Sequence, residues 1–321
     1  MSEPGTAAVA PWSSRAIFKV DAIVVAFSPD AQQINRLLDV LALECHRIYV
    51  MDNGGAREAV IIRPQTAAVS IVDMGSNQGI GAALNRGFQM AVEAGSDFVT
   101  TFDQDSQPCR GQIGALVEAF EQLRRAGARI AAVGPRTVDM REAIGIDHLF
   151  VRRRMGWPVA VDCGNGTAHI EVDFLITSGA LISMAAFHDI GQYDPALFID
   201  YTDIDWCLRA VARGYRLFGI CSVTMPHELS SGPAATALGM RVLNYRPVRR
   251  YYYARNVLRL CARAYVPPGW KARLMAGLIG RLLLLPVALR FSQDWTLHWR
   301  MLARGVSDGI RNRGGAYSDP R

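Results

Sequence analysis

Apolar runs that end in polar residues recur along the first hundred residues, and amphipathic segments separate them. The runs are rich in β-branched and aromatic residues, which predicts buried strands over 20–27, 47–51, 69–73 and 98–102. Between the first two, segment 31–44 repeats apolar residues at helical spacing. Strands that alternate with helices predict an α/β fold with a mostly parallel sheet, flanked by helices and joined by right-handed crossovers.

Polar residues follow each predicted strand. The four strand ends carry Ser28 and Asp30, Asp52 and Asn53, Asn77 and Gly79, and Asp103 and Asp105. Ligands of open α/β sheets bind at the carboxyl ends of the strands, so we expect these residues to line one crevice. Each residue type is also ordinary in turns, but four such ends in succession favour a binding site.

The tripeptide Asp103-Gln104-Asp105 offers the most specific chemistry at this edge. Two carboxylates, one residue apart, can hold a divalent cation through hard oxygen ligands, and the cation can hold a diphosphate. A simple turn before Pro108 is the alternative explanation. The glycine-rich segment 75–81 is not GxGxxG, and no Gly-Lys-Ser/Thr follows it. These differences argue against a dinucleotide oxidoreductase and a P-loop NTPase.

Two carboxylates of the second half lie at a predicted helix start. Asp203 and Asp205 fall in the first turn of a helix over 203–213, behind Thr202 as the expected cap. The helix dipole stabilises carboxylates in that position whether or not they react. An ionised Asp203 would also suit a general base.

Two further signals lie on either side of that helix. Segment 174–183 predicts a buried strand, and its Gly179 indicates either close approach of a ligand or a bulge. His227 follows another strand; most such histidines are not ligands, but a neutral imidazole suits a Mn²⁺ or Mg²⁺ site.

The N-terminus and the cysteines bear on the compartment. Residues 1–16 are small and polar without the apolar core of a signal peptide, which predicts a flexible arm. The six cysteines are scattered and form no CxxC pair. We therefore expect neither a disulfide framework nor a zinc site, and a reducing cytosol fits best.

The last part of the chain has a different character. Residues 241–321 hold fifteen Arg and one Lys against three Asp, a net charge of +13 in a chain whose total is +6. This balance predicts a basic helical extension that meets polyanions. The apolar stretch 274–289 is short for a membrane span, and its basic flanks indicate an interfacial helix on an anionic membrane. A buried core helix or an oligomer interface is the alternative.

At this point the motifs resemble family 2 glycosyltransferases of the GT-A fold, and most of all bacterial rhamnosyltransferases. The resemblance runs from about residue 20 to about residue 260 and divides the chain into the arm, a GT-A-like domain over 17–240 and the extension over 241–321. The segments that carry it are Val24 to Asp30, Met51-Asp52-Asn53, Asn77 to Gly87, Phe102 to Ser106, Thr177 to Ser183, Phe198 to Arg209, Met225 to Glu228 and Tyr251 to Asn256.

The resemblance implies roles for individual residues. The nucleotide-sugar would meet Phe27, Ser28, Asp30, Asp52, Asn53, Asn77, Gly79, Asn85, Asp103 and Gln104. Asp105 and His227 would bind Mg²⁺ or Mn²⁺, and Asp203 would be the catalytic base. Two departures stand out: the first strand ends in Phe27-Ser28-Pro29 where the family often has Tyr-Asn or Tyr-His-Pro, and Thr202-Asp203 replaces the usual Glu-Asp. Asp205 or Asp200 could therefore share the role of Asp203.

The resulting expectation is an inverting, metal-dependent glycosyltransferase of bacterial surface polysaccharide synthesis. Its donor would be dTDP-β-L-rhamnose or a UDP-sugar, and its acceptor a saccharide or lipid-linked saccharide at the inner face of the cell membrane. The extension is also a candidate surface for a homo-oligomer. A sugar-nucleotidyltransferase is the first alternative, but it would place a basic glycine-rich loop where residues 27–30 stand. A non-catalytic nucleic-acid-binding protein is the second, but the apolar stretch of the tail fits lipid better, so we expect no nucleic acid.

Overall fold

The computed structural model describes residues 18–62, 67–139, 150–164, 166–227, 233–237, 240–243, 246–288 and 294–318. The first half alternates strands and helices: β1 (Val20–Ala26), α1 (Ala31–Leu41), β2 (Arg47–Asp52), α2 (Ala56–Ala59), β3 (Ala68–Asp73), α3 (Ile80–Glu93), β4 (Phe98–Asp103), α4 (Gln112–Arg125) and β5 (Ile130–Asp139). The rest comprises β6 (Phe150–Arg154), β7 (Trp157–Val161), β8 (His169–Val172), β9 (Ala180–Ser183), α5 (Met184–Ile190), the 3₁₀ helix η2 (Pro195–Leu197), α6 (Thr202–Ala212), β10 (Arg216–His227), β11 (Pro233–Ala237), β12 (Met240–Leu243), α7 (Pro247–Cys261), α8 (Pro268–Ala288) and α9 (Trp295–Ile310).

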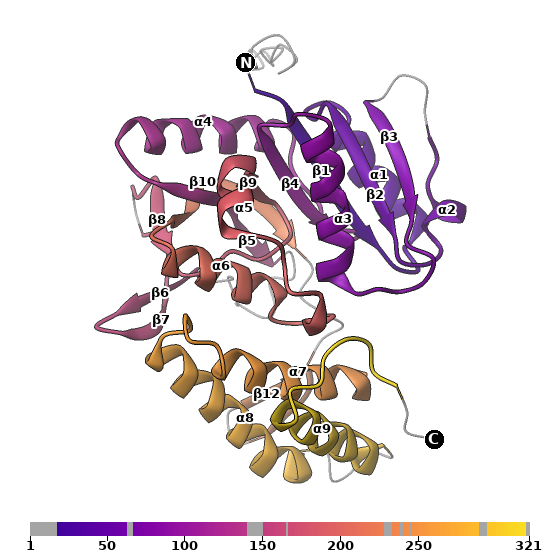
Figure 1. Cartoon of the computed structure of the whole chain (residues 1–321), viewed down its shortest axis with the longest axis vertical. Coiled ribbons are helices and arrows are strands. Elements are labelled where there is room, and N and C mark those ends of the chain that lie inside the picture. Colours follow the sequence, from indigo (N-terminus) through magenta and orange to yellow (C-terminus); the bar gives the residue numbers. More distant parts are fainter. Residues whose placement is uncertain are drawn as a thin grey trace, which may run out of the picture.

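An eight-stranded sheet in the order β3-β2-β1-β4-β9-β5-β10-β8 forms the centre of the molecule (Figure 1). Parallel pairing joins β3, β2, β1 and β4, and it also joins β5 to β10. Strand β9 runs antiparallel between β4 and β5, and β8 is an antiparallel edge. Because β9 is antiparallel to both of its neighbours, β4 and β5 run in the same direction. The carboxyl ends of β1 to β5 and of β10 therefore lie at one edge of the sheet. The predicted mostly parallel α/β fold is confirmed.

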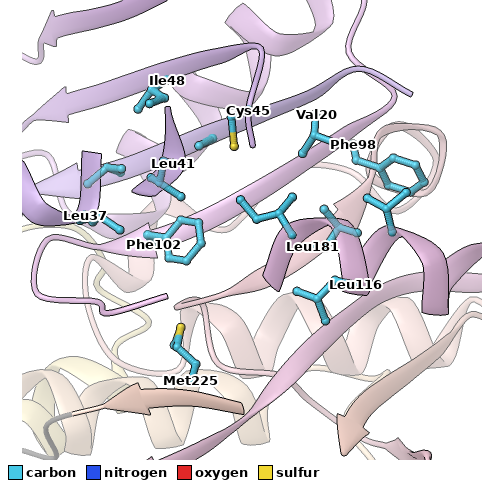
Figure 2. Close-up of a cluster of buried hydrophobic side chains, with 14 of the residues drawn as sticks. Val20, Leu37, Leu41, Cys45, Ile48, Phe98, Phe102, Leu116, Leu181 and Met225 are labelled. Carbon is cyan, nitrogen blue, oxygen red and sulfur yellow. The ribbon is translucent and has the colours of Figure 1, made fainter. Parts of the chain in front are cut away.

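Helices cover both faces of this sheet because successive residues of a strand point to opposite sides. Ala22 and Val24 of β1 pack with α1 and α4 in one buried cluster, which Figure 2 shows in part around Leu41, Phe102 and Leu116. Ile23 of β1 packs instead with α3, α5 and α6 in a second cluster. The sheet is therefore buried on both faces, as a parallel sheet requires.

The C-terminal helices α7, α8 and α9 lie beside α6 and form a third cluster (Figure 1). Leu208 of α6 packs there against Val257 of α7, Leu278 of α8 and Leu302 of α9. The predicted helical extension is thus present and shares its core with α6. Its boundary at residue 240 stays a prediction.

The structure corrects two local expectations. Strand β9 begins only at Ala180, because Gly179 has φ +81° and a Cβ on it would lie 2.9 Å from Pro135 and 3.0 Å from Met225. The positive φ and these neighbouring protein atoms are enough to require glycine at this position. Thr202 is the first residue of α6 and not its cap; Tyr201 occupies the cap position without a side-chain hydrogen bond.

The expectation of no disulfide is also wrong, because Cys163 and Cys221 are bonded. They are 58 residues apart and meet because the segment after β7 crosses β10, where the Cys221 amide donates to the Ala168 carbonyl. Since no local spacing marks such a pair, the sequence gives no sign of it. Cysteine usage consequently no longer supports a reducing compartment.

Residues 274–288 of the apolar stretch expected at 274–289 belong to α8, a helix of 21 residues. Among the described residues, no helix is long and apolar enough to cross a membrane.

Candidate active site

The ends of β1 and β4 meet through Phe27 and Gln104. The Phe27 amide donates a 2.6 Å hydrogen bond to Oε1 of Gln104, and the Ser28 amide donates to the Gly54 carbonyl at 2.6 Å. The Phe27 side chain is 50% exposed. An exposed aromatic face at this edge can stack on a nucleotide base.

Asp52 and Asn53, at the end of β2, are occupied by the backbone. The buried Asp52 carboxylate accepts hydrogen bonds from the amides of Gly54, Ala56 and Arg57 at 2.8 to 3.2 Å. The Asn53 side chain accepts from the Gln78 amide at 3.2 Å and donates to the Gly79 carbonyl at 3.4 Å. Both residues therefore shape the loops at the predicted edge.

The segment around Gly79 touches a second loop that comes from far along the chain. Gly79 has φ +83°, and a Cβ there would lie 2.5 Å from the Phe198 carbonyl oxygen. The Ile80 amide donates to that same carbonyl at 2.7 Å. Asn77 stabilises the turn by accepting from the Gly79 amide at 3.0 Å. The close approach of loop 196–201 thus explains this glycine.

Two predicted residues do not join this group. Asp30 is exposed and caps α1 by accepting from the Gln33 amide at 2.9 Å. Asn85 exchanges two 2.9 Å hydrogen bonds with the backbone of Tyr193. Local contacts account for both side chains.

Loop 196–201 leads into α6 and is conformationally strained. Phe198, Asp200 and Tyr201 all have positive φ values, between 60° and 66°, a region that non-glycine residues rarely adopt. Buried side chains of α7 hold the loop: Asn256 donates to the carbonyls of Leu197, Ile199 and Asp200 at 2.7 to 3.0 Å.

Two arginines of α7 complete this support. Arg255 is fully buried and donates to the carbonyls of Ala196 and Leu197. Arg249 forms an ion pair with the Asp200 carboxylate at 2.9 Å. Sequence reasoning noted the Arg255-Asn256 pair only through the resemblance, and its local surroundings gave no indication of this positioning role.

Asp203, in the first turn of α6, lies near two other carboxylates. It is half-buried, and its Oδ1 accepts from the Ile204 amide at 2.8 Å. Desolvation, with a smaller contribution from the negative charges of Asp103 and Asp200, raises the pKa of Asp203 to about 6, against the lowering effect of the Ile204 amide. The structure thus brings the end of β4 and the start of α6 together, although they are about a hundred residues apart.

Asp205 has different surroundings. It is almost fully buried, accepts a hydrogen bond from the Tyr265 hydroxyl and lies 3.4 Å from Arg209. Burial raises the pKa of Asp205, while Tyr265 and Arg209 lower it. Its carboxylate is therefore part of the packing between α6 and the turn after α7.

The predicted ligands of a divalent cation lie only partly within the described residues. Asp103 is half-buried and Asp105 is exposed at the end of β4, and carboxylate oxygens are the ligands that Mg²⁺ and Mn²⁺ prefer. His227 ends β10 at the same edge, but its side chain lies outside the described residues. Within those residues no group of three or more metal-ligating side chains occurs. Asp103 and Asp105 together fit a cation whose other ligands would come from a bound diphosphate.

This fold, with an acidic strand end facing an acidic helix start, defines the chain as a glycosyltransferase of the GT-A type. The sequence profile of Glycosyl transferase family 2 matches residues 22–191, more than half of the chain. The chain therefore belongs to glycosyl transferase family 2, which sets aside the nucleotidyltransferase and the non-catalytic alternatives. It is also 28% identical over 249 residues to the dTDP-rhamnosyl transferase RfbF of Shigella flexneri, covering 77% of this chain and 81% of that protein.

Solved structures agree on the fold. GalNAc-T7 with UDP, GalNAc and Mn²⁺ superposes with a TM-score of 0.57 at 11% identity, over 92% of this chain and 56% of that one. This chain thus spans little more than half the length of GalNAc-T7. S. aureus TarS in complex with UDP-GlcNAc gives a TM-score of 0.53 at 13% identity, over 91% of this chain and 81% of that one. Likeness at such identity shows the fold alone.

Proposed function

We propose that the protein transfers L-rhamnose from dTDP-β-L-rhamnose to a hydroxyl group of a saccharide acceptor, with inversion at the anomeric carbon. The observation that carries the proposal is the half-buried Asp203 carboxylate beside Asp103 at the carboxyl edge of the sheet. The similarity to a dTDP-rhamnosyl transferase supports the choice of donor.

The donor would lie along the ends of β1, β2 and β4. The exposed Phe27 ring would stack on the thymine base, and the loops stabilised by Asp52, Asn53 and Asn77 would present backbone groups to the nucleoside. Asp103 and Asp105 would hold a Mg²⁺ or Mn²⁺ ion together with the donor diphosphate. When bound, such an ion supplies positive charge that neutralises the leaving diphosphate.

Asp203 would act as the general base of a single displacement. The acceptor oxygen forms a bond to the anomeric carbon, the bond from that carbon to the diphosphate oxygen breaks, and the hydroxyl proton passes to Asp203. A base with a pKa of about 6 is ionised at neutral pH and still takes up a proton readily. Asp205 is less suited, because Tyr265 and Arg209 already bind its carboxylate.

The acceptor would be a saccharide linked to lipid at the inner membrane face, in surface polysaccharide synthesis. Exposed apolar side chains support membrane contact: Ile279 and Leu283 on α8, and Trp295 and Trp299 on α9. Each pair is spaced four residues apart and so shares a helix face. Together with the net charge of +13 over 241–321, this composition is typical of peripheral membrane binding.

A donor screen tests the proposal. We expect calorimetric titration with Mn²⁺ present to rank dTDP-rhamnose above UDP-GlcNAc and UDP-galactose. Asp105→Ala should lose the metal-dependent part of dTDP affinity while its thermal unfolding stays cooperative, because the exposed Asp105 side chain contributes little to packing. Preference for a UDP-sugar would replace the donor, and unchanged dTDP affinity in Asp105→Ala would remove the metal assignment.

A further inference from the structure

A cavity of about 270 Å³ lies between α6, α7, α8 and α9, outside the predicted donor site. Its lining contains three arginines, Arg249 and Arg250 of α7 and Arg281 of α8, together with Tyr201 and Tyr253. We propose that this cavity binds a phosphate or diphosphate group of the acceptor substrate. The inference rests on the proposed glycosyl transfer, and names the chemical class of acceptor.

The charge of the lining favours an anion. Among the described residues that line the cavity, Asp200 is the one carboxylate, against three guanidinium groups, and it pairs with Arg249 at 2.9 Å. The nearby His298 adds no negative charge: it accepts a 2.8 Å hydrogen bond from Arg250. Burial and Arg250 lower the pKa of His298 and outweigh the nearby Asp294 carboxylate, which raises it, so the imidazole stays neutral at pH 7.

The arginines are held in place, as selective recognition requires. Arg281 donates to the Tyr253 hydroxyl at 2.7 Å and lies over the Tyr253 ring at 4.2 Å. Arg250 is buried and fixed by its contact with His298. Guanidinium groups bind phosphate oxygens with paired, directional hydrogen bonds, so ordered arginines around a small cavity fit a phosphoryl group well.

The position of the cavity links it to the acceptor. Asp200 and Tyr201 line it and directly precede the first turn of α6, which carries Asp203. Three residues of backbone reach at most about 10 Å. A molecule with a hydroxyl group at Asp203 can therefore place an anionic group in the cavity. The donor diphosphate is expected on the other side of Asp203, toward Asp103.

The test uses the full chain and three proteins: wild type, Arg281→Gln and the matched control Arg300→Gln, whose side chain is exposed on α9 away from the cavity lining. Inorganic pyrophosphate and a short-chain isoprenyl diphosphate are titrated calorimetrically with EDTA present, so that metal-held anion at the donor site does not contribute. We expect Arg281→Gln to weaken both by about tenfold or more, the scale of one charged hydrogen bond, and Arg300→Gln to leave them unchanged. Tyr253→Phe, which removes the hydroxyl that Arg281 contacts, should weaken both ligands to a smaller extent.

Parallel titrations separate this inference from the proposed function. Binding of dTDP with Mn²⁺ should be equal in all three proteins. If Arg281→Gln leaves diphosphate affinity unchanged while dTDP binds, the cavity assignment falls and the proposed transfer stands. If dTDP fails to bind but the diphosphates still bind through Arg281, the cavity is an anion site and the proposed transfer falls. Equal weakening in Arg300→Gln, or an Arg281 effect seen only with phosphatidylglycerol vesicles, would overturn the acceptor assignment.

Discussion

At the scale of single residues, Asp203 has two opposing requirements. A general base must be ionised, yet burial and the charges of Asp103 and Asp200 favour the protonated carboxyl. A pKa raised in the folded state means that ionisation costs stability as the pH rises from about 4 to about 6, because the unfolded chain holds the proton less tightly there. The folded chain thus loses stability over the pH range in which the proposed base Asp203 becomes ionised.

Replacing Asp203 with Asn should show this opposition. Transfer should fall by roughly a hundredfold or more, because the amide cannot accept the proton, while donor binding persists. Without donor, the variant should be more stable than wild type by about 1–3 kcal/mol above pH 7, and the difference should vanish near pH 4. Turnover assays and urea unfolding across this range check both parts. If Asp205→Asn is the inactive variant instead, the base is wrongly assigned.

The pH profile of the wild type gives an independent check on the same carboxyl. Because kcat/KM reports the free enzyme, it should fall tenfold per pH unit below about pH 6, where Asp203 becomes protonated. Initial rates between pH 4.5 and 8 at low acceptor concentration measure this limb. A flat profile across pH 6 would contradict the assigned role.

At the scale of elements, α7 supports the strained loop that precedes Asp203. Three residues with positive φ store conformational energy, which the buried hydrogen bonds from Asn256 and Arg255 offset. We infer that the C-terminal extension positions the start of α6, which carries the proposed base Asp203.

Asn256→Ala should therefore reduce kcat more than donor affinity. The substitution leaves the carbonyls of Ile199 and Asp200 without their donor, while the Leu197 carbonyl keeps its hydrogen bond from Arg255. This loss costs about 1–3 kcal/mol of stability and lets loop 196–201 relax. The matched control is Tyr251→Phe on the same helix, which loses a 3.0 Å hydrogen bond to Asp308 and leaves the hydrogen bonds of Asn256 to loop 196–201 in place. Its kcat should be unchanged even where stability falls. Equal kcat loss in both variants would show a general effect of destabilisation.

At the scale of the whole molecule, the extension combines two surfaces. One packs on α6 through the third cluster, and the other exposes apolar side chains among many arginines. Each basic residue near an anionic membrane contributes about 1 kcal/mol, and salt screens that part of the attraction.

We expect the protein to sediment with phosphatidylglycerol vesicles, to be released largely by high salt and to ignore neutral vesicles. Leu283→Glu should weaken vesicle binding, because Leu283 is 68% exposed on α8. Leu43→Glu is the matched control, since Leu43 is an exposed leucine beyond the end of α1. Binding that is insensitive to salt and to lipid charge, or equally weakened by both substitutions, would contradict a peripheral mode.

The sequence by itself determined the features that depend on neighbouring residues. Apolar periodicity predicts the strands and helices of the parallel sheet, since burial of alternate or every third to fourth residue follows from local geometry. The Asp-x-Asp pair at the end of β4 and the cap at Asp30 could be predicted for the same reason.

Only the tertiary structure decided what depends on contacts between distant segments. Asp203 and Asp205 look alike in sequence because both lie in the first turn of one helix. The structure distinguishes them, since Asp203 lies near Asp103 while Asp205 contacts Tyr265. It likewise joins Cys163 to Cys221 and places Asn256 under the loop before α6. These outcomes follow from how β4, α6 and α7 pack together, and packing is a property of the whole chain that no local pattern contains.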